Sequence, residues 1–257
     1  MRGRMMFPRI EPLSLPRRWV RDIMHFGRKS YSAGGNTIIN IAPLVAARRA
    51  YCPSISHAAL LVKAVALVGQ RRPQLRQAYM PFPFPHLYSH PHTVATIVVE
   101  REWRGEQVVL FDQIQRPEEK SLAEIDRLLR GMKRGPVEGI SGFRHLIRIA
   151  RIPWPIRGLV WRFGLYFSGR LRAKYFGTLS INSVVARRTE IMQSVTPLTF
   201  AFFYGVIESN GDMPLQIIVD HRVIDGAPTR RVATELQSIL NTELVAELHR
   251  DAAGNAK

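Results

Sequence analysis

Apolar side chains recur every three or four positions in four stretches of the chain, the spacing that predicts one buried face of a helix. The clearest of these helices begins at Ser56, a residue type that caps helices well, and ends at Gly69 and Pro73. The other three are predicted near residues 16–26, 117–131 and 228–240.

Strands are predicted where β-branched and aromatic residues gather between turns. These stretches are residues 36–41, 93–99, 107–111, 177–185, 198–208 and 215–221. Arg104-Gly105 and Asn210-Gly211 are the turns between neighbouring strands. The order of helices and strands predicts an α/β (α+β) two-layer sandwich, in which a mixed sheet is covered by helices.

The composition is that of one folded domain, expected over residues 1–257. The 257 residues are 46% hydrophobic, and neither an internal repeat nor a low-complexity linker divides them. No apolar run is long enough for a membrane span or a secretory signal, so a cytoplasmic protein is expected. Cys52 is the single cysteine, which excludes an intramolecular disulfide and a cysteine-rich zinc site.

Positive charge dominates the chain. The 37 Lys and Arg residues outnumber the 20 Asp and Glu residues and give a formal net charge of +17. Such a charge favours polyanionic partners: nucleic acid, anionic lipid, acidic carrier proteins or phosphorylated cofactors. Nucleic acid is not an expected partner, because no helix-turn-helix, zinc or aromatic RNA-binding motif accompanies the charge.

A segment at about residues 139–175 mixes basic and aromatic residues and is predicted to be an insert in the domain. No acidic residue lies between Glu138 and Glu190, a pattern typical of an amphipathic helix at a membrane interface. Three interpretations remain open: a helical hairpin that packs on the domain, docking on an anionic membrane, and recognition of an acidic acyl carrier protein. The second would place the protein at the membrane periphery.

His221 lies where chemistry is expected. In an extended strand it continues the apolar row of residues 215–219, so it would be half enclosed at the strand end. An imidazole in such a place can take a proton from a thiol or hydroxyl near neutral pH. Asp225 follows where it can fix the turn, and Gly226 tolerates conformations closed to other residues. The competing interpretation is a core histidine followed by an aspartate that caps the last helix.

Residues 220–227, with the sequence Asp-His-Arg-Val-Ile-Asp-Gly-Ala, carry more than a bare histidine pattern. They resemble, nearly residue for residue, the signature of the dihydrolipoyl acyltransferase catalytic domain of 2-oxo acid dehydrogenase complexes. Weaker matches follow in the same order at Pro73-Gln74-Leu75, Lys120-Ser121-Leu122-Ala123-Glu124-Ile125 and Gly177-Thr178-Leu179-Ser180-Ile181-Asn182-Ser183. The resemblance covers about residues 10–245.

The resemblance implies a chloramphenicol acetyltransferase-like fold and a homotrimer, or a larger cage, with active sites at subunit interfaces. Coenzyme A or acyl-CoA would be a substrate, and no metal would be needed. In that family the histidine, here His221, deprotonates the attacking group, and a hydroxyl on a neighbouring strand stabilises the oxyanion. The aspartate, here Asp225, pairs with an arginine near the N-terminus, for which Arg17, Arg18 and Arg21 are the candidates.

The sequence departs from the family at the oxyanion position. Aligned without gaps, the catalytic serine falls on Asn182, with Ser183 one place later and Ser180 two places before. Asn182 and Ser180 share one face of a strand and both can donate a hydrogen bond, so the donor is left open. No lipoyl domain precedes the catalytic region, so we expect no covalent lipoyl group on this chain and a role outside the core of a conventional dehydrogenase complex.

His86, His90 and His92 lie in a proline-rich stretch and raise the question of a metal site. No carboxylate lies close in sequence, and we expect instead a loop that covers the active site or forms a trimer contact.

These observations predict a free-standing acyltransferase that moves an acyl group between a thioester, of CoA or a carrier, and a thiol, hydroxyl or amine. The alternative is a non-catalytic trimeric scaffold or binding protein with the same fold, an interpretation that the missing serine at position 182 supports.

Overall fold

The computed structural model describes residues 12–28, 30–183 and 196–255. The helices and strands follow one another as α1 (Leu15–Gly27), β1 (Ser32–Asn40), α2 (Ala42–Tyr51), α3 (His57–Arg71), β2 (Gln77–Met80), β3 (His86–Ser89), β4 (Val94–Trp103), β5 (Glu106–Gln115), α4 (Leu122–Arg134), α5 (Ser141–Arg151), α6 (Trp154–Tyr166), α7 (Gly169–Phe176), β6 (Leu179–Ser183), β7 (Phe200–Tyr204), β8 (Asp212–Asp220), α8 (Gly226–Asn241) and α9 (Glu243–Asn255).

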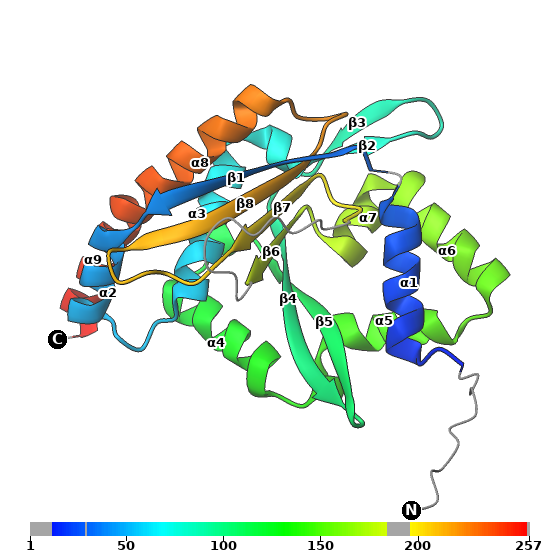
Figure 1. Ribbon diagram of the computed structural model, residues 1–257, viewed down its shortest axis with the longest axis horizontal. Helices are drawn as coiled ribbons and strands as arrows, with labels where there is room; N and C mark the ends of the chain where they lie inside the picture. The colour runs from blue at the N-terminus through cyan, green and yellow to red at the C-terminus, as the bar shows by residue number, and fades with distance from the viewer. Residues whose placement is uncertain (1–11, 29, 184–195, 256–257) are drawn as a thin grey trace, which may run out of the picture.

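Six strands form one mixed sheet in the order β1-β8-β7-β6-β4-β5 (Figure 1). β6 pairs in parallel with β4 and β7, whereas the other neighbours are antiparallel. β2 and β3 form a separate hairpin. The mixed sheet covered by helices that the sequence predicts is therefore confirmed.

One face of the sheet carries the main core. Alternate residues of the inner strands, among them Ile181, Phe202 and Ile217, are buried there with side chains of α3 and α8. α3 begins where Ser56 Oγ accepts a hydrogen bond from the backbone N–H of Ala59, as its capping role predicts. Because α3 contacts α4 and α8 as well as the sheet core, ten of its fifteen residues are buried.

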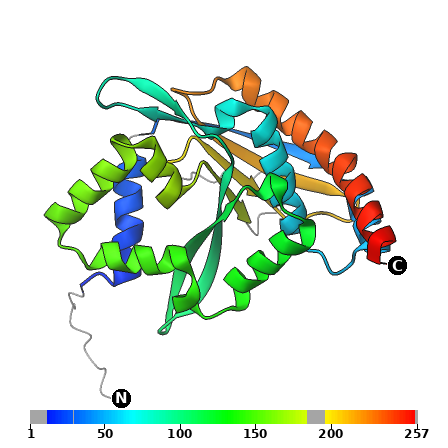
Figure 2. The same cartoon turned by 180° about the vertical axis from the view of Figure 1, so that it is seen from behind.

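A second core lies at the opposite end of the molecule from α9, where α1, α5, α6 and α7 gather near β5 (Figures 1 and 2). It is rich in aromatic rings: the Trp161 ring of α6 lies 4.8 Å from that of Trp19 and 5.3 Å from that of Phe26, both in α1. Helices α5 to α7 occupy the segment where the basic aromatic insert is predicted. No helix in the described part of the chain is both long enough and apolar enough to cross a membrane.

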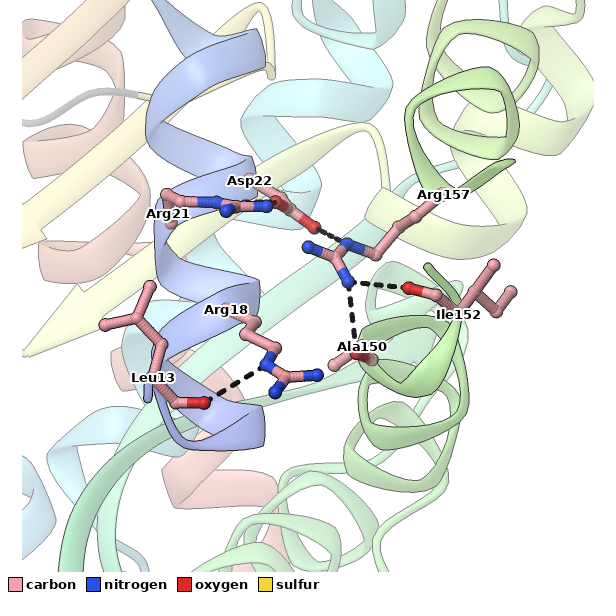
Figure 3. Close-up of polar contacts among 7 residues, drawn as sticks. All are labelled: Leu13, Arg18, Arg21, Asp22, Ala150, Ile152 and Arg157. Carbon is pink, nitrogen blue, oxygen red and sulfur yellow. Dashed lines mark hydrogen bonds and ion pairs between the residues drawn. The ribbon is translucent and has the colours of Figure 1, made fainter. Parts of the chain in front are cut away.

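A buried ion pair joins α1 to α6 (Figure 3). Arg157 Nε lies 2.5 Å from Asp22 Oδ2, and the two residues are 3% and 0% exposed. Arg157 also donates to the backbone carbonyls of Ala150 and Ile152 at the end of α5, at 3.1 and 2.7 Å. Arg21 donates to the other oxygen of Asp22 at 3.0 Å. The Asp22–Arg157 pair therefore ties together α1, α5 and α6, three of the four helices of the second core.

Removing one partner of this pair should destabilise the protein strongly, because the other charge would stay buried without compensation. We expect Arg157→Met to lower the free energy of unfolding by about 3 to 5 kcal/mol, measured by urea denaturation. The double variant Asp22→Leu, Arg157→Met should recover part of that loss. The control is Arg148→Met, which removes an exposed arginine of α5 and should change stability by no more than about 0.5 kcal/mol. Equal effects of Arg157→Met and Arg148→Met would contradict the role of the pair.

Candidate functional site

The chain leaves the sheet directly before His221. β8 ends at Asp220, and the Asp220 side chain accepts a hydrogen bond from the backbone N–H of Arg222 at 3.1 Å, which starts a tight turn. The backbone N–H of His221 donates to the carbonyl of Tyr31 at 2.8 Å. The His221 side chain is 55% exposed. His221 therefore lies one residue beyond the end of β8, with about half of its side chain exposed.

The turn is held by an ion pair that the sequence reasoning did not single out. Arg222 donates from Nε and Nη2 to the two oxygens of Asp220, at 2.9 and 2.6 Å, and the Asp220 side chain is fully buried. The guanidinium of Arg222 lies 4.4 Å from the ring centre of Tyr79. Burial alone would lower the pKa of Arg222, but the hydrogen bonds and the charge of Asp220 raise it. The residues directly before and after His221 are therefore joined by an ion pair, which fixes the turn.

A second arginine approaches Asp220 from α7. Arg172 is 4% exposed and donates to the carbonyls of Tyr79, at 3.0 Å, and Pro197. Burial lowers the pKa of Arg172 to about 10, and the charge of Asp220 opposes that shift. Even at this value Arg172 is positively charged at neutral pH, so the charges of both Arg172 and Arg222 act on the Asp220 carboxylate.

In the part of the chain that the structure describes, Asp225 pairs with His221 and not with an arginine. Its Oδ1 is 3.3 Å from His221 Nδ1, and its side chain is 82% exposed. Asp225 occupies the cap position of α8, directly before Gly226, but makes no side-chain capping bond. Its backbone carbonyl accepts a hydrogen bond from Thr229 Oγ1 at 3.0 Å.

The pairing of Asp225 with an arginine of α1 is not found within this chain. Arg17 lies 3.3 Å from Glu106. Arg18 donates to the carbonyl of Leu13 at 3.1 Å, and Arg21 pairs with Asp22 (Figure 3). The reason is the position of α1, which packs against α5 and α6 in the second core.

Ser180 and Asn182 lie on the same face of β6, and both are buried. Asn182 Nδ2 donates to Ser180 Oγ at 3.2 Å and to the carbonyl of Phe202 at 3.1 Å, so both amide hydrogens are used. Because Ser180 Oγ accepts this bond, its own hydroxyl proton is available for another acceptor. Ser183 lies exposed at the end of the strand, on the opposite face, and hydrogen-bonds with Tyr204, whose pKa is raised by burial.

Gly177 sets the position of β6 beside β4. Its φ of +85° lies in the region that favours glycine, and a Cβ there would be 2.2 Å from Thr96 Oγ1 and 2.8 Å from the carbonyl oxygen of Val94. Only a residue without a side chain fits so close to β4 at the end of α7.

His221 and Asn182 do not meet within one chain. Asn182 pairs with Phe203 of β7, which pairs in turn with Gln216 of β8. His221 lies five residues beyond Gln216, which at about 3.3 Å per residue is a separation of about 17 Å along the strands. Within one chain the structure therefore brings together His221 with Asp225, and Ser180 with Asn182, but not the two pairs.

A cavity of about 350 Å³ lies between β1, β8 and α8. Its lining includes Gly34 and Gly35 of β1, Val219 of β8, and Thr229 and Arg230 of α8. Val219 and Thr229 flank the turn that carries His221, so the cavity adjoins that turn. Its volume is within the usual range for a small-molecule site.

The three histidines of the proline-rich stretch lie on and beside the β2–β3 hairpin. The rings of His90 and His92 are 4.6 Å apart, and the Tyr88 hydroxyl lies 3.0 Å from His90 Nδ1. Burial, followed by the charges of His92 and Arg76, lowers the pKa of His90 to about 4. Among the residues that the structure describes, no three His, Cys, Asp or Glu side chains are grouped so that they could hold a metal ion.

No protein-family model matches the sequence, and no curated protein matches it. Solved structures share its fold. A dihydrolipoamide acetyltransferase from Azotobacter vinelandii, studied for the role of a serine, a histidine and an asparagine in its catalytic mechanism, superposes with a TM-score of 0.67 at 14% identity, covering 96% of each chain. A truncated catalytic core of the 2-oxoacid dehydrogenase multienzyme complex from Thermoplasma acidophilum gives a TM-score of 0.67 at 15% identity, over 91% of this chain and 99% of that one.

A chloramphenicol acetyltransferase matches with a TM-score of 0.52 at 12% identity, over 89% of this chain and 98% of that one. The chain therefore has the fold that these acyltransferases share, which confirms the fold expected from the resemblance at residues 220–227.

The lowered pKa of His90 predicts a loss of stability in acid. The unfolded chain takes up a proton near pH 6.5, whereas folded His90 stays neutral down to about pH 4. The free energy of unfolding should therefore fall as the pH drops from 6.5 towards 4. We expect His90→Gln to lose less stability over this range than the unaltered protein, measured by urea denaturation at each pH. The control is Leu87→Gln, at an exposed position of the same hairpin; a pH dependence changed equally by both variants would argue against His90.

Proposed function

We propose that this protein is an acyltransferase that moves an acyl group between a thioester, of CoA or of a carrier protein, and a thiol, hydroxyl or amine acceptor. The observation that carries the proposal is the accessible imidazole of His221, on a turn held by the ion pair of Asp220 and Arg222, in a fold shared with acyltransferases. His221 acts as the general base.

The proposed proton transfer uses the two nitrogens of His221 differently. Asp225 lies 3.3 Å from Nδ1, so a proton on that nitrogen faces a carboxylate and Nε2 is left as the acceptor. Nε2 takes the proton of the attacking thiol, hydroxyl or amine as it adds to the thioester carbonyl. The tetrahedral adduct then breaks its C–S bond, and the leaving thiolate takes the proton back from Nε2, so the acyl group is on the acceptor and the free thiol is released. The histidine and asparagine named for the Azotobacter enzyme have the same sequence spacing as His221 and Asp225.

Ser180 is the proposed donor to the carbonyl oxygen on which negative charge develops. Its hydroxyl proton is available, because its oxygen accepts from Asn182, while both amide hydrogens of Asn182 are already used. Asn182 then acts as a positioning residue that fixes the Ser180 hydroxyl. Ser183 is the less favourable candidate, because it faces the other side of β6 and bonds with Tyr204.

The active site is proposed to form between two copies of the chain, in a homotrimer or a larger cage. Two observations support this: in its own chain His221 is about 10 Å along the strands from the level of Ser180, with β7 lying between their two strands, and the His221 side chain is exposed. The structural neighbours include the cubic core of a pyruvate dehydrogenase multienzyme complex.

A non-catalytic scaffold with the same fold is the second candidate. It is favoured by Asn182, whose amide is fully used inside the chain at the position where the family has its catalytic serine. The two candidates differ in whether activity depends on His221.

Replacing His221 should abolish activity without unfolding the protein. We expect His221→Ala to lower the rate of acyl transfer by about 10² to 10⁴-fold, because the general base is lost. The assay is release of free CoA from a panel of acyl-CoA thioesters in the presence of thiol, hydroxyl and amine acceptors. The matched control is His145→Ala, an exposed histidine of α5, which should keep its rate. Unchanged CoA release in His221→Ala, with thermal unfolding also unchanged, would favour the scaffold.

Mixing two inactive variants tests whether the site is shared. We expect Ser180→Ala to lower kcat by about 10² to 10³-fold through loss of the oxyanion donor. When Ser180→Ala and His221→Ala are unfolded together and refolded, mixed oligomers should regain activity, because some sites then combine an intact His221 with an intact Ser180 from another copy. The variants refolded separately should stay inactive. No recovery, in mixtures shown by mass spectrometry to contain both variants, would rule out a site formed by these two residues across copies.

A further inference from the structure

Helix α6 is apolar on two opposite faces. One face is buried in the second core through Trp161 and Leu165. The other points to solvent and carries Ile156, Leu159, Val160, Phe163 and, one residue beyond the helix end, Phe167, which are 56%, 62%, 39%, 55% and 46% exposed. These five positions follow the three-to-four-residue spacing of a single helix face. A helix that is apolar all round is normally buried, so an uncovered second face calls for a partner.

The β2–β3 hairpin extends this apolar surface. The Phe82 ring, between the two strands, lies 4.1 Å from the Phe167 ring, which lies 5.5 Å from that of Phe163. Phe82 and Phe84 are 47% and 65% exposed. We call the exposed apolar face of α6 with Phe167, Phe82 and Phe84 the apolar ridge. It lies at the end of the molecule away from α9 (Figures 1 and 2).

The charges of α5, α6 and α7 are all positive. The sequence from 139 to 183 contains no acidic residue. The exposed basic side chains in this segment are Arg144, Arg148, Arg151, Arg162, Arg170 and Lys174. Asp22, the acid that pairs with Arg157 of α6, is itself buried. Arg151 and Arg170 flank the ridge in sequence, and Arg162 lies on α6 itself.

We propose that the apolar ridge docks this protein on an anionic membrane surface. α6 would lie flat in the plane of the membrane, with the ridge at the boundary of headgroups and acyl chains and the arginines at the lipid phosphates. Large apolar side chains beside Arg and Lys, without acidic residues, are the combination that such a surface binds. A second copy is disfavoured as the occupant of this face, because pairing two ridges would bring their flanking exposed arginines together without acidic residues between them.

The test uses the full chain and vesicles of phosphatidylcholine, alone or mixed with phosphatidylglycerol. We expect the protein to sediment with the mixed vesicles, to sediment weakly with phosphatidylcholine alone, and to be released by salt. The ridge variant Leu159→Ser, Phe163→Ser should lower the partition coefficient about tenfold or more, because less apolar area enters the membrane. The charge variant Arg151→Glu, Arg162→Glu should lower binding to the mixed vesicles and leave the weak binding to phosphatidylcholine vesicles unchanged.

The matched control is Val109→Ser, Val206→Ser, which removes two exposed apolar side chains outside the ridge. It should bind as the unaltered protein does. Because all four apolar positions are exposed, both double variants should keep their thermal unfolding transitions.

Three results would overturn the proposal. The first is equal binding of the ridge variant and the control to mixed vesicles. The second is a ridge variant that changes only the oligomeric state in analytical ultracentrifugation, which would make the ridge an interface between copies. The third is binding to a purified acyl carrier protein that depends on the ridge, with no binding to vesicles, which would assign the surface to an acidic protein.

Discussion

The burial of two arginines in a segment without acids is the constraint on which the arrangement of the molecule depends. Arg157 of α6 and Arg172 of α7 are both almost fully buried, and the segment that carries them has no acidic residue. Each is therefore compensated from elsewhere: Arg157 by Asp22 of α1, and Arg172 in part by Asp220 of β8. The second of these acids also holds the turn of His221. The position of the apolar ridge and that of the candidate base thus follow from the same electrostatic requirement.

Local signals in the sequence predict much of the fold. The Ser56 cap and the apolar run after it predict α3, and β-branched stretches predict most strands of the sheet. Helix α2 was not predicted, because Pro43 and two arginines interrupt its apolar pattern. The β2–β3 hairpin is hidden in a stretch expected to be a loop because of its prolines. The pairing of Asp22 with Arg157 has no local signal, since the two residues come together only when α1 and α6 pack.

In the candidate site too, local features are predicted from the sequence and long-range contacts are not. The motif at residues 220–227 identifies His221 as the candidate base. The structure adds that its two neighbours, Asp220 and Arg222, form the ion pair that holds the turn. Alternation along β6 predicts that Ser180 and Asn182 share a face, as they do. The register of β6, β7 and β8 could not be predicted from the sequence, and this register separates Asn182 from His221 within one chain. Register depends on pairing between distant strands and not on any one of them.

The exposed row of apolar side chains on α6 has a consequence for how copies of this protein behave in water. Such a row promotes association, and long-range repulsion between chains of charge +17 opposes it. That repulsion extends over a Debye length of about 8 Å at physiological ionic strength and only about 3 Å in 1 M salt. Salt strengthens the apolar attraction relative to the repulsion and at the same time weakens attraction to anionic surfaces. Ionic strength therefore decides between two kinds of binding. Low salt favours binding to an anionic surface, and high salt favours self-association of the protein.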